Sequence, residues 1–230
     1  IKYINQSLFE ARDYKPIWEI LSENNINIGV FGSLQSYPPL RGENIKYYLP
    51  DTFSPDSDAH PKELKEFQSI NLSLTNENKA ISRSLKREDI LKFFKLSIKG
   101  YISKRAELKI LIHLIKEKIN SNYKSRRSIM QGVLSFDLFI RKIKTYKPSF
   151  STYFTNHVAG MMHRYWRDLF PSDFGLDPNK INKFNSKSIL KAMDITDKHL
   201  RELIKLSKKE EYNIWVISSM GQGAIDRGEY

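Results

Sequence analysis

The segment INIGVFG (Ile26–Gly32) decides the fold class, because it is a short apolar and β-prone run closed by a glycine. Such a run is typical of a parallel strand that is buried on both faces. It directly follows KPIWEILSEN (Lys15–Asn24), whose early proline and helically spaced apolar residues predict a short helix. A helix that leads into a buried strand is the unit of an α/β sheet, so we expect an α/β fold.

Two further segments have the character of strands. SFSTYFT (149–155) alternates aromatic and hydroxyl residues after Pro148, which predicts a strand. YNIWVIS (212–218) is apolar and follows an amphipathic helix predicted over 186–207, so we expect a second buried strand there. The Pro-, Ser- and Asp-rich residues between Ser33 and Pro61 predict an ordered surface loop or lid.

The positive charge belongs to one part of the chain. Residues 83–147 hold 18 Lys and Arg against five Asp and Glu, whereas the whole chain has a net charge of +12. Apolar residues at helical spacing predict one or two helices over 83–119, broken near Gly100, and another over 128–144. We therefore expect three segments: an α/β core segment with a lid loop (1–82), a basic helical insertion or cap (83–147) and a second α/β core segment (148–230).

Composition sets limits on the chemistry. The chain has 230 residues, of which 40% are hydrophobic, enough for the core of one globular domain. The absence of cysteine excludes disulfides and cysteine-ligated zinc, and leaves His, Asp, Glu and Asn as metal ligands. No apolar stretch has the length of a transmembrane helix and no export signal is evident, so we expect a soluble domain and favour the cytoplasm.

Potential functional groups follow the predicted strands. Ligands of open α/β sheets bind beyond the carboxyl ends of the strands. Asn156, His157 and His163 are the densest set of candidate metal ligands there, although three or four protein ligands are normal for such a site. The alternative is that one histidine caps a helix and the other packs beside Tyr165 and Trp166.

Other chemical candidates have simpler explanations. The serines and glycines of SSMGQG (218–223) lack the motif and partner base of a nucleophile, which favours a glycine turn after a strand. His60, His113 and His199 are interpreted as surface or packing residues. The basic and aromatic residues of 92–105 allow a nucleic-acid partner, but such spacing is more typical of a solvated helix face.

At these same segments the chain resembles the alkaline phosphatase superfamily, in its type I phosphodiesterase, nucleotide pyrophosphatase and phosphomutase-like branch. GVFGSLQSYPP (29–39) looks like the family's strand and TYPP-like loop, AGMMHRYW (159–166) like its metal-binding histidine segment, and VISSMG (216–221) like its Ser-Asp-His-Gly segment. The resemblance implies a mostly parallel sheet flanked by helices, with an inserted helical cap. It also implies an upstream Thr or Ser nucleophile before Ile1 and two metal ions.

The departures from the family pattern concern the metal ligands. Ala159 stands where the family has an aspartate, and Ser219 and Met220 stand where it has an Asp-His pair. Neither a hydroxyl nor a thioether replaces a carboxylate and an imidazole as ligands. The resemblance therefore implies a partial chain with an altered metal site, holding Zn or Mn or having lost its metal.

Two functional hypotheses follow from the resemblance. The first is a divergent phosphodiester or phosphomonoester hydrolase or transferase, with Asn156, His157 and His163 at the metal. Its substrate contacts would be Arg164, with Ser219 and Gln222 as neutral hydrogen-bonding groups. The second is a non-catalytic protein that binds a polyanion or a phosphorylated glycan. In both, the partner is a phosphorylated or sulfated small molecule or glycan, and nucleic acid is not favoured.

Overall fold

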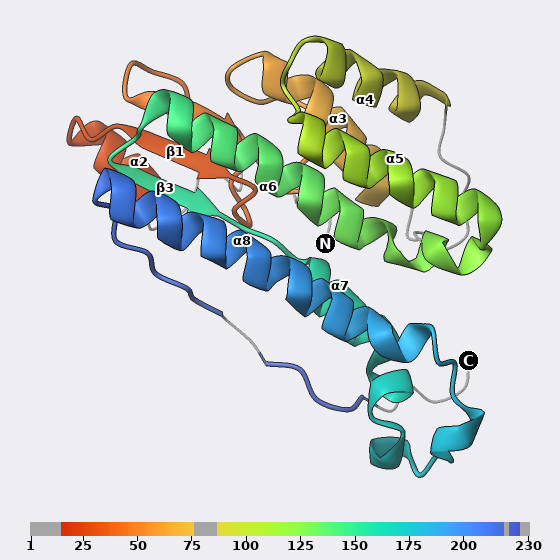
Figure 1. The fold of residues 1–230 in the computed structure, drawn as a ribbon. Coiled ribbons are helices and arrows are strands. Elements are labelled where there is room, and N and C mark those ends of the chain that lie inside the picture. Colours follow the sequence, from red (N-terminus) through yellow and green to blue (C-terminus); the bar gives the residue numbers. More distant parts are fainter. Residues whose placement is uncertain (1–14, 76–86, 219–220, 226–230) are drawn as a thin grey trace. The chain divides into compact units, whose positions relative to one another are not determined.

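The computed structural model describes residues 15–75, 87–218 and 221–225, in which lie seven α-helices and three strands (Figure 1). The described residues form two compact units. The first contains the residues up to Leu111 together with Asp137–Thr155, and the second contains Ile112–Phe136 together with the residues from Asn156 onward. The predicted segments 1–82, 83–147 and 148–230 were defined by the distribution of charge along the sequence. The two units are defined by contacts in space, so they do not test those segments, which stay a prediction.

The first unit contains a small parallel sheet. Its strands are β1 (Ile28–Phe31), β2 (Ile45–Leu49) and β3 (Phe150–Tyr153), in the order β2-β1-β3. Both neighbours run parallel to β1. This confirms the α/β class and the strands predicted around β1 and β3, whereas β2 lies where a loop was expected. The alkaline-phosphatase-like arrangement stays a prediction.

Helices cover the sheet on both faces. On one face, buried Ile28 and Val30 of β1 pack with Trp18 and Leu21 of α2 (Ile17–Glu23). The other face is aromatic, and Phe31 is its centre. The ring centroid of Phe31 lies 6.1 Å from Phe67 of α3 (Glu63–Thr75), 5.7 Å from Phe139 of α6 (Arg127–Tyr146) and 6.0 Å from Tyr153 of β3.

Gly29 allows a side chain to cross the central strand. A Cβ atom on Gly29 would lie 2.2 Å from the ring of Tyr47, so the ring rests directly on the backbone of β1. From there the Tyr47 hydroxyl reaches Ser151 on β3, with an oxygen-to-oxygen distance of 2.6 Å. One tyrosine of β2 thus links all three strands.

The described part of the basic segment is mainly helical, and its helices are interrupted at residues 99–103. It forms α4 (Arg87–Ile98), α5 (Lys104–Ile119) and α6, joined to α5 by a short 3-10 helix (Ser121–Arg126). Gly100 has a φ of +69°, which ends α4 where the break was expected. The next helix is capped by Ser103, whose hydroxyl accepts a hydrogen bond from the Ala106 N–H at 3.2 Å.

The second unit is built around two helices that pack side by side. They are α7 (His157–Leu169) and α8 (Ser188–Glu210), joined by three short 3-10 turns. Met161 of α7 and Ile189 and Ala192 of α8 are buried. Helix α8 confirms the amphipathic helix predicted over 186–207. Within the described ranges, no helix is long and apolar enough to cross a membrane.

The prediction of a buried strand over 212–218 is wrong. These residues follow α8 without regular secondary structure, and Trp215 and Ile217 are 87% and 89% exposed. Apolar and β-branched residues favour a strand only where a neighbouring strand and a packed face receive them, and no such pairing is recorded for this segment. Tertiary context therefore overrides its local propensity.

Candidate functional site at the carboxyl edge of the sheet

The carboxyl ends of the three parallel strands meet at one edge of the sheet. The chain leaves β1 toward β2 on one side, and β3 pairs on the other side. Strand order therefore reverses between β1 and β3. In open α/β sheets this position, outside the carboxyl ends, is where ligands bind.

Two hydroxyl groups meet at this position. The Ser33 hydroxyl, which directly follows β1 and Gly32, donates a hydrogen bond to Oγ1 of Thr152 on β3 at 2.7 Å. Gly32 has a φ of +74°, in the region that favours glycine, and a Cβ there would lie 3.4 Å from the Phe154 carbonyl oxygen. The turn after β1 can therefore lie close to the end of β3.

A buried carboxylate holds the loops after β1 and β2 together. Asp51 is buried, and its side chain accepts hydrogen bonds from the backbone N–H groups of Gln35 and, at 2.8 Å, of Phe53. The Asp51 N–H donates in turn to the Ser36 hydroxyl at 3.2 Å. A carboxylate that accepts several backbone N–H bonds holds the backbone around it in one conformation. Asp51 therefore gives this loop a defined structure.

Helix α3 holds the same loop through hydrogen bonds to its backbone and to one of its side chains. The buried Gln68 amide donates to the carbonyl oxygens of Pro50 and Asp51, at 3.2 and 2.8 Å, and to the Ser54 hydroxyl at 2.8 Å. The Ser54 hydroxyl in turn donates to the carbonyl oxygens of Asp51 and Asp56, both at 3.0 Å, so these buried polar groups have hydrogen-bond partners. The position of the edge is thus fixed by the helix that packs under the sheet.

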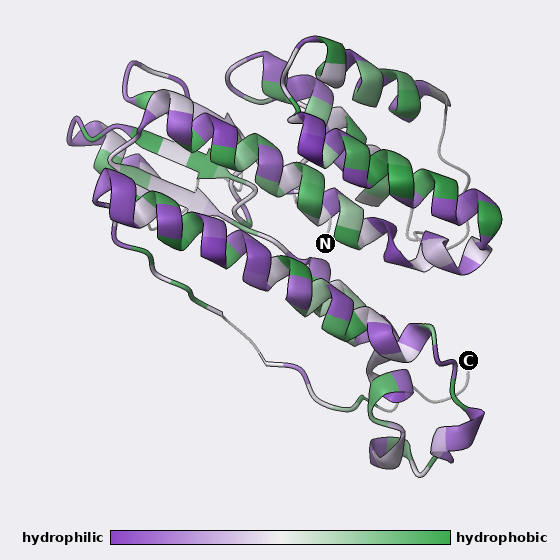
Figure 2. Cartoon of the chain, viewed as in Figure 1, coloured by the Kyte–Doolittle hydropathy of each residue, from purple (hydrophilic) through white to green (hydrophobic). Residues whose placement is uncertain are grey.

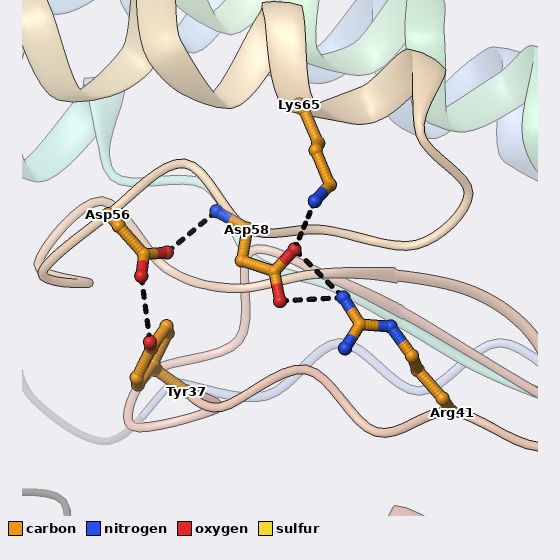
Figure 3. A network of polar contacts seen from close by, with 5 residues as sticks. All are labelled: Tyr37, Arg41, Asp56, Asp58 and Lys65. Carbon is orange, nitrogen blue, oxygen red and sulfur yellow. Dashed lines mark hydrogen bonds and ion pairs between the residues drawn. The ribbon is translucent and has the colours of Figure 1, made fainter.

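Charged residues surround the outer part of this loop (Figure 3). The Asp58 carboxylate accepts two hydrogen bonds from the Arg41 guanidinium, at 2.8 and 2.6 Å, and pairs with Lys65 at 2.6 Å. Asp56 accepts the Tyr37 hydroxyl at 2.9 Å and the Asp58 N–H at 2.7 Å. The two cations already have a carboxylate partner, so an anionic ligand would compete with Asp58 for them.

The network changes the acidity of two of its members. Burial, together with the bond to Asp56, raises the pKa of Tyr37 to about 12. Burial acts to raise the pKa of Asp58, but the bonds from Lys65 and Arg41 outweigh it and lower the pKa overall. Near neutral pH the tyrosine is therefore a hydrogen-bond donor and the aspartate a carboxylate.

The predicted metal ligands lie at and near the start of α7. Asn156 precedes the helix and is exposed, His157 is its first residue and is buried, and His163 lies six residues further on and is exposed. At about 100° per residue, six positions place the two histidines on different faces of the helix. The structure does not bring their rings together.

His157 packs within the second unit. Its Nε2 lies 3.1 Å from the Thr196 hydroxyl of α8, and a Cβ on Gly132 of α6 would lie 2.7 Å from its Nδ1. The ring centroid of His199 is 6.1 Å away, and His199 itself stacks on Phe136 at 4.0 Å. Burial lowers the pKa of His157, although a hydrogen bond with the Ala192 backbone opposes this.

As they stand, these residues do not fit one shared metal ion. The imidazole of His157 is buried between helices, whereas His163 is exposed. Among the residues that the structure describes, no group of three or more His, Cys, Asp or Glu side chains could hold a metal. Zn or Mn binding by Asn156, His157 and His163 therefore stays a prediction that draws no support from this geometry.

Two of the three predicted substrate contacts, Arg164 and Gln222, lie among the described residues. Arg164 is half-buried on α7, next to His163 in the sequence. The amide of Gln222 donates to the adjacent Gly223 carbonyl at 2.8 Å. Ser219 lies outside the described residues. Their role in binding stays a prediction.

Sequence reasoning missed the residues that organise the edge. The segment that contains Arg41, Asp51 and Asp58 was interpreted only as a polar surface loop. Gln68, which lies outside that segment, was not singled out. The signal was the run PDTFSPDSD (50–58), in which acidic and hydroxyl residues directly follow the β-prone IKYYL (45–49). Acidic residues after a strand in a parallel sheet are candidates for the carboxyl edge.

Comparison of the chain with models of protein families, with curated proteins and with solved structures finds no match. The resemblance to the alkaline phosphatase superfamily is thus neither supported nor opposed by these comparisons. The geometry of the carboxyl edge and the chemistry of the residues there are what point to a function.

Proposed function

We propose that the chain binds a phosphoryl- or sulfuryl-bearing ligand at the carboxyl edge of its sheet. The observation that carries this proposal is the Ser33–Thr152 hydroxyl pair, which lies where strand order reverses around β1. Hydroxyl groups both donate and accept hydrogen bonds, so the pair can exchange its mutual bond for bonds to ester oxygens. The Asp51 network holds the neighbouring loop in place without itself facing solvent.

The reaction class comes from the resemblance. The first form of the proposal is a divergent alkaline-phosphatase-like hydrolase or transferase of phosphodiesters or phosphomonoesters. The second form is a non-catalytic domain that holds a polyanion or a phosphorylated glycan. Both forms place the anionic group at the same edge, so one set of variants tests them together.

The test uses bis(p-nitrophenyl) phosphate and p-nitrophenyl phosphate as probes, with binding measured by calorimetry and turnover by release of nitrophenol. We expect Ser33→Ala and Thr152→Val each to weaken binding about tenfold, the effect of losing one hydrogen bond to a charged group. Ser207→Ala is the matched control, because this hydroxyl on α8 donates to the Ile204 carbonyl in its own helix. It should bind like the unchanged chain.

The outcomes separate the two forms. Turnover that is lost with a chelator and restored by Zn or Mn selects the hydrolase, and binding without turnover selects the non-catalytic domain. Equal binding by the Ser33, Thr152 and Ser207 variants would remove the ligand from this edge. Circular dichroism of each variant checks that the sheet and helices remain folded.

A further inference from the structure

Helix α5 carries a stripe of apolar residues that are exposed in the described part of the chain. Four residues spaced by four, three and four positions are exposed by 58%, 42%, 57% and 81%: Leu108, Ile112, Ile115 and Ile119. This spacing places them along one narrow line on the helix, about 17 Å long at about 1.5 Å per residue. The buried side of the helix is formed by other residues, among them Ala106, His113 and Glu117.

Basic residues border this stripe on both sides. At about 100° per residue, Arg105 and Lys116 lie on one side of the stripe, and Lys104 and Lys118 lie on the other. All four are exposed. Of the two acidic residues of α5, Glu107 offsets the charge of Lys104 by pairing with it at 2.9 Å, whereas Glu117 is buried against Arg127 and does not face the stripe.

Helix α4 repeats the pattern on a smaller scale. Leu91, Phe94 and Ile98 are exposed at spacings of three and four. Lys95 and Lys99 lie beside them, and both pair with Glu66 of α3, at 2.5 and 3.5 Å. Figure 2 shows hydrophobic residues recurring between hydrophilic ones along both α4 and α5. Exposed apolar residues are thus a repeated feature of the basic segment and not a single surface leucine.

We propose that α5 docks in the plane of an anionic lipid surface. An apolar stripe bordered by Lys and Arg is the arrangement that lies at the boundary between headgroups and acyl chains. There the isoleucines leave water, and the basic side chains extend upward to meet the lipid phosphates. The proposal is independent of the ligand proposed for the carboxyl edge of the sheet.

Charge distinguishes this occupant from the alternatives. A second copy of the chain would bring its own lysines and arginines against those of α5, and like charges across an interface oppose association. An acidic amphipathic helix would meet the charge, but it usually enters a groove, whereas this stripe is a convex ridge on a single helix. A lipid surface accommodates a ridge and supplies a continuous field of negative charge.

Co-sedimentation of the 230-residue chain with vesicles tests the proposal. We expect binding to vesicles of phosphatidylcholine and phosphatidylglycerol, and much weaker binding to phosphatidylcholine alone or at high salt. The double variant Ile115→Ser with Ile119→Ser should lose at least about tenfold in affinity, because two isoleucines no longer enter the apolar layer. Lys116→Glu with Lys118→Glu should lower binding to the anionic vesicles and leave the salt dependence shallower.

The matched control is Leu190→Ser with Met193→Ser on α8. These residues are also exposed and apolar, but Asp194 and Asp197 adjoin them. This variant should bind vesicles like the unchanged chain. Urea denaturation of each variant verifies that the substitutions have not unfolded it.

Four results would overturn the proposal. The first is no binding to the anionic vesicles by the unchanged chain, and the second is equal binding by the α5 and α8 variants. The third is self-association in sedimentation velocity that disappears in the Ile115/Ile119 variant, which would assign the stripe to a second copy. Binding of a glutamate-rich amphipathic peptide without vesicle binding would assign it to a protein partner.

Discussion

Tyr47 lies directly over the backbone of Gly29, and this contact links the three strands through Ser151. An alanine methyl at position 29 would lie 2.2 Å from the ring, so the tyrosine or the strand must move. We expect Gly29→Ala to lower the free energy of unfolding by about 2 kcal/mol, a typical effect of overpacking. Urea denaturation followed by circular dichroism measures it.

Gly160 provides the control for this substitution. It lies inside α7, and nothing is within 4 Å of the position that a Cβ would occupy. Gly160→Ala should therefore raise the free energy of unfolding by about 0.5 to 1 kcal/mol through helix propensity. Similar losses at both positions would show that the Tyr47 contact is not what makes Gly29 necessary.

The buried His157 predicts a dependence of stability on pH. Burial lowers its pKa in the folded chain below the unfolded value of 6.5, so the unfolded chain binds the proton first. Its contribution is present above the unfolded pKa and is lost as the pH falls below about 6.5 toward the folded pKa. We expect a larger fall in melting temperature between about pH 7.5 and about pH 5.5 for the unchanged chain than for His157→Gln.

The exposed His163 on the same helix is the control for this experiment. His163→Gln should retain the pH dependence of the unchanged chain. If His157→Gln retains it as well, the acid sensitivity arises elsewhere in the protein. Measuring all three chains in one buffer series removes differences in ionic strength.

At the scale of elements, a buried ion cluster joins α5 to α6. The Glu117 carboxylate accepts hydrogen bonds from Nε of Arg127 at 2.9 and 3.0 Å, and lies 3.1 Å from Nε2 of His113. Burial acts to raise the pKa of Glu117, but the bonds from His113 and Arg127 outweigh it and lower the pKa to about 2. The carboxylate is therefore charged inside the protein.

Removing this charge should weaken the link between the two helices. Glu117→Gln replaces the buried carboxylate that the half-buried Arg127 contacts, and we expect the free energy of unfolding to fall by about 3 kcal/mol near neutral pH. Because the folded pKa is depressed, the stabilisation is present above about pH 4.5 and is lost as the pH falls toward about 2. The difference between the two chains, measured by urea denaturation, should shrink over that range.

The exposed pair Asp197 and Arg201 on α8 provides the comparison. Asp197→Asn should leave the unfolding midpoint almost unchanged, because solvent screens a surface ion pair. An effect of the same size at both positions would mean that burial does not set the strength of the Glu117 cluster.

At the scale of the whole molecule, local patterns predicted most of the fold. The helices of the basic segment, the break at Gly100, α8 and the strands β1 and β3 all follow from apolar spacing and from proline and glycine. β2 was missed because its five residues stand within a Pro-, Ser- and Asp-rich stretch that outweighed them. The exposed 212–218 segment shows the opposite error, since strand propensity requires a partner strand to take effect.

The candidate site was less predictable than the fold. The topological rule located the ends of β1 and β3, but it could not show that Ser33 would bond to Thr152 across 119 positions of sequence. Nor could spacing alone place His157 in a packed interior and His163 in solvent. Long-range pairing and burial depend on how elements come together, and a single sequence carries little of that information.

The contact of Tyr47 with Gly29 has a consequence for how this protein can diverge. We expect the three positions, one on each strand, to change together in evolution. The large ring at 47 fits over a glycine at 29 and is anchored by the hydroxyl at 151. In related chains, a residue other than glycine at 29 should be accompanied by a smaller residue at 47. Once the tyrosine at 47 is lost, position 151 no longer needs a hydroxyl to bond to it. The residues at 29, 47 and 151 should therefore covary.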